Sequence, residues 1–229
     1  RTQWGEIKIS EGNEPLLNAT LHLNPAGPVA SGECGENLTW TLTGDGTLTI
    51  SGSGKMEDYS YSNSAPWYAD REKVRSVFME PGVTSVGSYA FMQCTNLISV
   101  KIPEGVTSIG EAAFVLCTNL ASVVIPEGVT SLGRNAFATC DSLTSVTIPA
   151  SVTYASSMAF GACFTLGNIF VEEGNASYDS VDGILFNKDH TTLITYPAGR
   201  KDTSYTIPEG VTKVDQYAVY NCWYLTSVT

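Results

Sequence analysis

Residues 120–140 read LASVVIPEGVTSLGRNAFATC, and the pattern in this stretch recurs along the chain every 23 residues. Its segment Val129-Thr130-Ser131-Leu132-Gly133 is preceded by Val106-Thr107-Ser108-Ile109-Gly110 and by Val83-Thr84-Ser85-Val86-Gly87. The same register carries the pairs Ala90-Phe91, Ala113-Phe114, Ala136-Phe137 and Ala159-Phe160, the cysteines Cys94, Cys117, Cys140 and Cys163, and the leucines Leu97, Leu120, Leu143 and Leu166. A constant period of this length predicts a stacked repeat protein.

Each unit begins with an apolar alternation that predicts a β-strand. Leu97, Val100 and Ile102 follow the L-x-x-L-x-L half of a leucine-rich repeat, so the residues between them point the other way. Pro103 ends this strand because proline has no N–H to donate to a neighbouring strand. The strand is therefore one short side of a closed rung.

The second half of a unit is expected to return the chain to the next strand. Residues 106–109 form a second extended piece, which turns at Gly110 into one short helical turn over residues 111–117. Ala113, Phe114 and Cys117 of this turn are expected to face inward. One rung cannot bury its apolar side chains alone, so the unit is stable only in an array.

The array extends beyond its regular middle, and the sequence predicts a β-rich α/β solenoid with short convex helical turns over residues 65–229. Residues 65–79 form a degenerate first rung, with Tyr68 in the position of Phe91. A 13-residue expansion enlarges the unit at about 172–207, where residues 183–189 and 193–197 predict a hairpin with an Asn/Asp turn.

The residues before the array fall into two parts. Residues 38–42 and 47–50 flank Gly44-Asp45-Gly46, which predicts a second hairpin, and we interpret residues 34–64 as an N-terminal hairpin cap. Residues 1–33 fit neither cap nor repeat and are assigned to a leader or to the tail of a preceding segment. Because the chain begins at Arg1 and stops at Thr229 inside a rung, we expect an excerpt with an exposed apolar end that could make end-to-end self-contacts.

Composition excludes several classes of partner. The 229 residues hold 12 Lys and Arg against 23 Asp and Glu, a net charge of −11, which disfavours binding to nucleic acid and to anionic lipid. Hydrophobic residues make up 43% and charged residues 15%, which favours a packed core over disorder. Membrane insertion is not expected, since no apolar stretch approaches the roughly 18 to 20 residues that cross a bilayer.

The units of the form L-x-S-V-x-I-P-x-G-V-T-S-I-G-x-x-A-F-x-x-C resemble the BspA-like class of bacterial leucine-rich repeats. Residues 34–40 together with 46–52 look like the cap that precedes such arrays in surface proteins of Gram-positive gut bacteria. The resemblance implies a secreted or surface-attached protein, and some members of that class are adhesins for host matrix proteins. Ser156 and Asp215 depart from the pattern at the position of Gly110, which leaves the local turn geometry open.

The six cysteines admit three interpretations. Neighbouring rungs would bring Cys94, Cys117, Cys140 and Cys163 close enough for disulfides to be considered. Parallel side chains pointing into the core favour buried free thiols instead, since a small apolar thiol fits under the turn. A metal site is disfavoured because there is no C-x-x-C pair or nearby histidine. No cofactor is expected.

Catalysis is not expected either, and we predict that the chain is not an enzyme. The two histidines, His22 and His190, have no evident Ser or Cys partner backed by an acid, so both are expected to be exposed and idle. The carboxylates at 172–173 and 179–182 are interpreted as a solvated turn. Weak calcium binding is the alternative, because oxygen ligands are present. The D-x-D-x-D-G spacing of a calcium-binding loop is absent, which disfavours it.

The candidate binding surface is the concave strand face, where repeat proteins commonly bind their partners. Its two outward rows are Ser99, Ser122, Ser145 and Asn168, and Lys101, Val124, Thr147 and Phe170. The face could also be merely a solvated sheet. Phe170, next to an expanded loop with Tyr178, Phe186 and Tyr196, either marks a contact site or packs under that loop.

These observations predict a non-enzymatic extracellular leucine-rich repeat module of a bacterial cell-surface or secreted protein. It would bind a host or bacterial surface protein or glycan, in an adhesion-like role. Two alternatives stay open: a passive spacer within a larger surface protein, and an accessory module of an enzyme whose catalytic domain lies outside this sequence.

Overall fold

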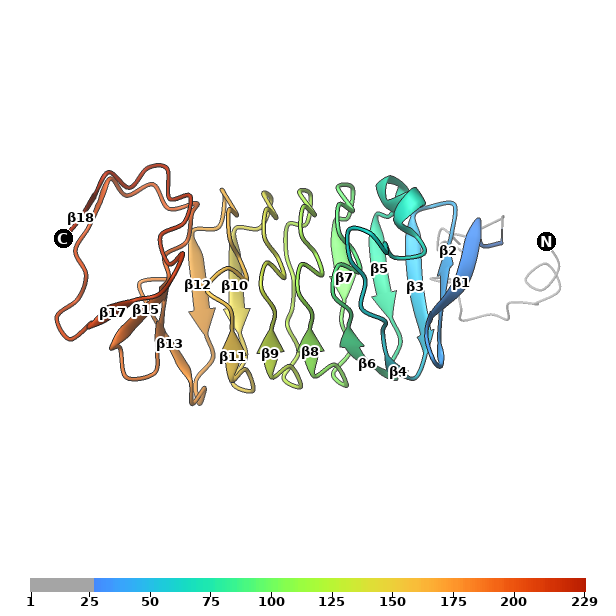
Figure 1. Ribbon diagram of the computed structural model, residues 1–229, viewed down its shortest axis with the longest axis horizontal. Helices are drawn as coiled ribbons and strands as arrows, with labels where there is room; N and C mark the ends of the chain where they lie inside the picture. The colour runs from blue at the N-terminus through green and yellow to red at the C-terminus, as the bar shows by residue number, and fades with distance from the viewer. Residues whose placement is uncertain (1–26) are drawn as a thin grey trace, which may run out of the picture.

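The computed structural model describes residues 27–229, and in this part the chain winds into a solenoid whose rungs lie side by side along the long axis (Figure 1). His22 and most of the predicted leader, residues 1–33, lie outside the described residues. The elements are β1 (Ala30–Gly35), β2 (Leu38–Leu42), β3 (Thr47–Gly52), β4 (Gly54–Lys55), the 3₁₀ helix η1 (Tyr68–Lys73), β5 (Ser76–Met79), β6 (Val83–Val86), β7 (Ser99–Lys101), β8 (Ser108–Ile109), β9 (Ser131–Leu132), β10 (Ser145–Ile148), β11 (Tyr154–Ala155), β12 (Asn168–Val171), β13 (Tyr178–Val181), β14 (Ile184–Asn187), β15 (Thr192–Thr195), β16 (Ser204–Tyr205), β17 (Lys213–Val214) and β18 (Ser227–Val228).

Two files of short strands run along the solenoid, and their pairing is parallel except among β1, β2 and β3. One side has the sheet β1-β2-β3-β5-β7 and, further along, the pair β10-β12. The other side has the sheet β4-β6-β8-β9-β11. The registers repeat the period of the sequence, since Val77 lies opposite Val100 and Ile109 opposite Leu132. Residues 121–125, between β7 and β10, are expected to be a strand but are not assigned to one.

Convex helical turns were expected on the third side of each rung, but the structure has non-helical turns there. Residues 111–116 form turns, and η1 is the only helix within residues 27–229. The N–H groups of Ala112, Phe114 and Leu116 donate to carbonyls of the next rung, at 2.8, 2.8 and 3.0 Å. An α-helix needs these donors for its own carbonyls. Ala112 and Leu116 also have positive φ values of 52° and 62°, which interrupt a right-handed helix.

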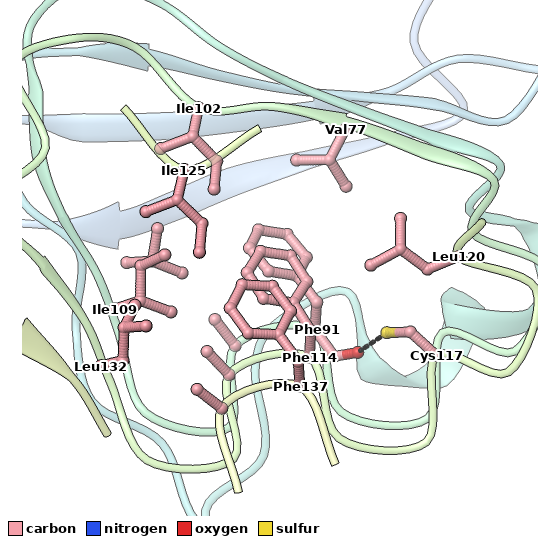
Figure 2. Close-up of a cluster of buried hydrophobic side chains, with 14 of the residues drawn as sticks. Val77, Phe91, Ile102, Ile109, Phe114, Cys117, Leu120, Ile125, Leu132 and Phe137 are labelled. Atoms are coloured by element: carbon pink, nitrogen blue, oxygen red, sulfur yellow. Dashed lines mark hydrogen bonds between the residues drawn. The ribbon is translucent and has the colours of Figure 1, made fainter. Parts of the chain in front are cut away.

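The core lies inside the rungs and is built from repeated positions. Phe91, Phe114 and Phe137 stack in file, as Figure 2 shows, with ring centroids 5.0 and 5.2 Å apart. The stack continues to Phe160 at 5.6 Å. All four rings are buried, so the inward direction predicted for the Ala-Phe positions is confirmed.

The first rung departs from the expected alignment. Trp67, not Tyr68, stacks on Phe91, with centroids 5.4 Å apart, and its indole N–H donates to the carbonyl of Ala90 at 2.8 Å. The prediction for Tyr68 was wrong by one residue because η1 occupies the turn of this rung. From Val77 onward the predicted register holds.

The N-terminal strands form an antiparallel sheet that runs into the solenoid. β2 pairs with β3 around Gly44-Asp45-Gly46, which confirms that predicted hairpin. β1, which was not predicted, pairs with β2 on the outer edge. β3 then pairs in parallel with β5, and Trp40 of β2 packs edge-on against Trp67 with centroids 5.6 Å apart.

The expanded unit contains the predicted hairpin and also a strand that was not predicted. β13 pairs antiparallel with β14, so residues 179–181 form a strand and not the solvated turn expected at 179–182. β14 and β15 form an antiparallel hairpin, and the side chains of Asn187 and Asp189 accept backbone N–H bonds in its turn. Tyr196 brings the chain back into register 36 residues after Phe160, because its N–H donates to the carbonyl of Ala218 as that of Phe137 does to Ala159. β15 then pairs in parallel with β17, and β16 with β18.

Candidate binding surface

The strand face, defined as the outward side of β3, β5, β7, residues 121–125, β10 and β12, displays both predicted rows. Pairing places Ser145 beside Asn168 and Thr147 beside Phe170, and Ser99 beside Ser76 of the preceding rung. The eight predicted residues are all exposed: Ser99, Lys101, Ser122, Val124, Ser145, Thr147, Asn168 and Phe170. The strand positions alternate as the sequence indicates, with Val146 and Ile148 buried.

Two large apolar side chains stand out on this face. Val124 is 79% exposed and Phe170 is 47% exposed. The Phe170 ring is therefore only partly covered by its neighbours. The three aromatic residues expected to join it, Tyr178, Phe186 and Tyr196, are buried within the expanded unit, which corrects that part of the expectation.

Lys101 lies in the same row and provides a positive charge. Its ammonium group lies 5.2 Å from the ring centroid of Phe78 in the preceding rung. Among the described residues it makes no ion pair. The row from Phe78 to Phe170 thus combines exposed apolar groups with a cation that is free to pair.

The cysteines are part of the core. The thiols of Cys117, Cys140 and Cys163 donate to the carbonyls of Phe91, Phe114 and Phe137, at 3.2, 3.4 and 3.0 Å. Burial raises the pKa of Cys94 to about 12 and that of Cys117 well above its ordinary value. A raised pKa suppresses the thiolate, so these groups are poor nucleophiles and metal ligands.

The polar groups of the expanded unit make local contacts. His190 is exposed as expected, but it is not idle, since its Nε2 lies 2.8 Å from Asp179 Oδ2. This hydrogen bond lowers the pKa of Asp179. The carboxyl of Glu172 lies next to that of Glu127 two rungs earlier, and their hydrogen bond raises the pKa of Glu172. Within residues 27–229 no three His, Cys, Asp or Glu side chains gather as a metal site would require.

One exposed feature was missed by the sequence reasoning. Phe164, Ala198, Trp223 and Tyr224 line an open hollow of about 370 Å³ near the last rungs. The signal was present, because Phe164 and Trp223 directly follow the cysteines Cys163 and Cys222, where Thr95 and Thr118 stand in the regular rungs.

No helix in the described part of the chain is long and apolar enough to cross a membrane.

Comparison with known families gives a match over most of the chain. The family described as BspA type leucine-rich repeat region matches residues 66–192 and 198–229 in six copies. A comparison with curated protein sequences found no match.

Solved structures give the same fold. The chain is 30% identical to a leucine-rich repeat protein from Eubacterium ventriosum, with a TM-score of 0.70, covering 87% of this chain and 62% of that one. It is 20% identical to the pneumococcal vaccine antigen PcpA, with a TM-score of 0.59 and coverages of 89% and 65%. It is 23% identical to a leucine-rich repeat protein from Bacteroides ovatus, with a TM-score of 0.53 and coverages of 85% and 52%. The chain spans less than two thirds of the length of each, and the last two show a likeness of fold alone.

Proposed function

Because the chain belongs to the BspA-type leucine-rich repeat family, we propose that it is a non-enzymatic binding module of a bacterial protein that is secreted or attached to the cell surface. Its partner is a protein or glycan of a host or of another bacterium, held in an adhesion-like interaction. The strand face is the surface that makes this contact.

The observation that carries the proposal is the exposure of apolar groups where the fold does not need them. Thr147 occupies the same row as Val124 and Phe170, so a polar side chain satisfies this position. An exposed valine and phenylalanine lie in line with Lys101, which makes no ion pair with residues 27–229. Such a row is typical of an interaction surface, in which a few large side chains supply most of the binding energy.

The proposal also assigns roles to the parts of the chain. In this proposal residues 65–229 form the binding solenoid, and residues 34–64, together with the first part of β1 (Ala30–Gly35), form a cap over the apolar end of the first rung. Trp40 and Trp67 support the cap, since both are buried against one another at the junction of sheet and solenoid.

Immobilised matrix proteins, mucins and glycans provide the test, with the chain in solution and bound protein measured in physiological salt and in about 0.5 M salt, where surface charge attraction is screened. We expect binding that persists in salt and is lost in the Lys101→Ala and Phe170→Ala double variant. Tyr154→Ala, an exposed aromatic change on β11 in the opposite file of strands, is the matched control and should bind normally. Equal binding by the double variant and by the wild type would contradict the strand-face assignment.

A second candidate function is a passive spacer, favoured by the row of small hydroxylated side chains at Ser99, Ser122 and Ser145. Serine in such a row is also typical of a plain solvated sheet. Absence of binding across the whole panel would favour the spacer. The accessory role is tested by determining the complete reading frame and looking for a catalytic domain next to this module.

A further inference from the structure

The segment between each repeated cysteine and leucine, called here the corner of the rung, changes character along the solenoid. The corners of the regular rungs are polar: Thr95-Asn96, Thr118-Asn119 and Asp141-Ser142. The later corners hold Phe164-Thr165 and Trp223-Tyr224. Three aromatic side chains therefore stand where the repeat ordinarily has small polar ones.

The fold does not require these aromatic groups. Thr118 and Asn119 have rungs on both sides, yet they are half-buried and exposed respectively, so the corner faces solvent within a continuous array. Trp223 is 74% exposed, Tyr224 47% and Phe164 40%. An exposed tryptophan at a position that accepts threonine is typical of a contact residue.

The expanded unit creates a hollow between the two aromatic corners. Its returning segment passes between them, and the N–H of Gly199 donates to the carbonyl of Leu166 at 3.0 Å. The small side chain of Ala198 there leaves an open volume of about 370 Å³ bounded by Phe164, Trp223 and Tyr224. Phe164 and Trp223 meet edge to face, with centroids 6.2 Å apart, so the indole is supported from one side.

The positively charged side chain of Lys201 lies at the edge of this hollow. The ammonium group of Lys201 lies 4.8 Å from the ring centroid of Tyr224 and 3.4 Å from its hydroxyl oxygen. Lys201 forms no ion pair with any residue from 27 to 229. The neighbouring Arg200 forms an ion pair with Asp202, with Nε and Oδ2 2.7 Å apart. Lys201 therefore provides the positive charge that is available to a ligand.

We propose that this aromatic corner, Phe164, Ala198, Lys201, Trp223 and Tyr224, binds a uronic acid residue of a β-linked acidic glycan. A hexuronate ring with equatorial substituents has two apolar C–H faces, one of which stacks on the exposed indole. Its carboxylate lies at the edge of the ring, nearly in the ring plane, where it pairs with the ammonium group beside Tyr224. The site is separate from the strand face, and the proposal goes beyond the function proposed above.

The chemistry of the rim distinguishes this ligand from other occupants. A neutral sugar would stack on the indole but leave the Lys201 charge unused. An apolar peptide side chain would fill the hollow without using the hydroxyl of Tyr224 or the ammonium group. The net charge of −11 disfavours polyanions such as nucleic acid, but it acts only weakly on the carboxylate of one uronate, because in physiological salt charges more than about 8 Å away are largely screened.

Titration of the whole chain with a tetrasaccharide that contains glucuronic acid tests the proposal. Binding is monitored by calorimetry and by tryptophan fluorescence. We expect saturable binding with a fluorescence change, weakened more than about tenfold in Trp223→Ala. Lys201→Gln should weaken binding of the glucuronate but not of a neutral glucose tetrasaccharide. Phe170→Ala on the strand face should bind the glucuronate normally, and thermal unfolding verifies that each variant is folded.

Several outcomes would overturn the proposal: no saturation at millimolar glucuronate, unchanged binding in Trp223→Ala, or equal affinity for the neutral tetrasaccharide with no effect of Lys201→Gln. Tighter binding of a sialylated oligosaccharide or of an apolar peptide would also overturn the uronate assignment. Loss of partner binding through the strand face leaves this titration unaffected, so failure of one proposal is distinguishable from failure of the other.

Discussion

The thiol of Cys117 donates a hydrogen bond to the carbonyl oxygen of Phe91 in the preceding rung, at 3.2 Å (Figure 2). The same bond joins Cys140 to Phe114, Cys163 to Phe137 and Cys222 to Tyr196, at 3.4, 3.0 and 3.5 Å. At these four positions a side chain joins one rung to its neighbour, in addition to the backbone bonds. A small thiol at this position fits beneath the turn and satisfies a carbonyl group of the preceding rung.

The aromatic stack predicts a large loss of stability when one ring is removed. Phe114→Ala deletes a fully buried ring that contacts Phe91 and Phe137, so we expect the free energy of unfolding to fall by about 3 to 5 kcal/mol. Urea denaturation measures this change. Phe170→Ala removes an exposed ring of the same size and should change stability by no more than about 0.5 kcal/mol. Equal effects of the two substitutions would contradict the stacked core.

The buried thiols predict a loss of stability at high pH. Burial raises the pKa of Cys94 from 9.0 to about 12, so the folded state keeps a proton that the unfolded chain loses. This contribution is fully present below pH 9 and is lost as the pH rises toward 12. By pH 10 the part of this contribution that has been lost amounts to roughly 1 kcal/mol.

The measurement compares urea denaturation of the wild type and of Cys94→Ala at pH 8 and pH 10. The wild type should lose stability more steeply than the variant, while the titration of lysines and tyrosines affects both equally. Parallel losses in the two proteins would show that this thiol titrates normally in the folded state.

Two glycines of the same rung should respond differently to an added methyl group. At Gly110 a Cβ would lie 2.5 Å from the backbone nitrogen of Ser88 in the preceding rung, whereas at Gly105 it would meet the carbonyl oxygen of Val83 at 3.4 Å. We expect Gly110→Ala to cost about 1 to 3 kcal/mol of stability, because backbone must move. Gly105→Ala should lie within about 0.5 kcal/mol of the wild type in thermal or urea unfolding. A tolerated Gly110→Ala would mean that the rungs are less closely packed than described.

The sequence predicted the solenoid because its period appears directly in the spacing of Phe91, Phe114 and Phe137. The turn geometry could not be predicted in the same way. Whether residues 111–117 form a helix depends on where their N–H groups find acceptors, and those acceptors belong to the next rung. A short helix and this turn bury the same side chains, so the apolar pattern does not separate them.

The same distinction explains the other differences. Counting back 23 residues from Phe91 gives Tyr68, but η1 shifts the first rung by one residue and places Trp67 in the stack. The outward rows of the strand face followed from strand alternation, which is local. The aromatic corner depends on residues 198 and 201 of the expanded unit meeting corners on either side of it, and this meeting is visible only in three dimensions.

Deleting one whole rung tests the central claim, that each turn of the chain is stabilised by turns with the same interface. Removing residues 118–140 joins Cys117 to Asp141 and brings β7 beside β10 in the same register. Circular dichroism with urea denaturation should show a folded, cooperatively unfolding β protein, while removal of residues 118–129, about half a period, should leave an unfolded chain. If the whole-rung deletion is as unfolded as the half-rung deletion, the rungs are not interchangeable and the account is wrong.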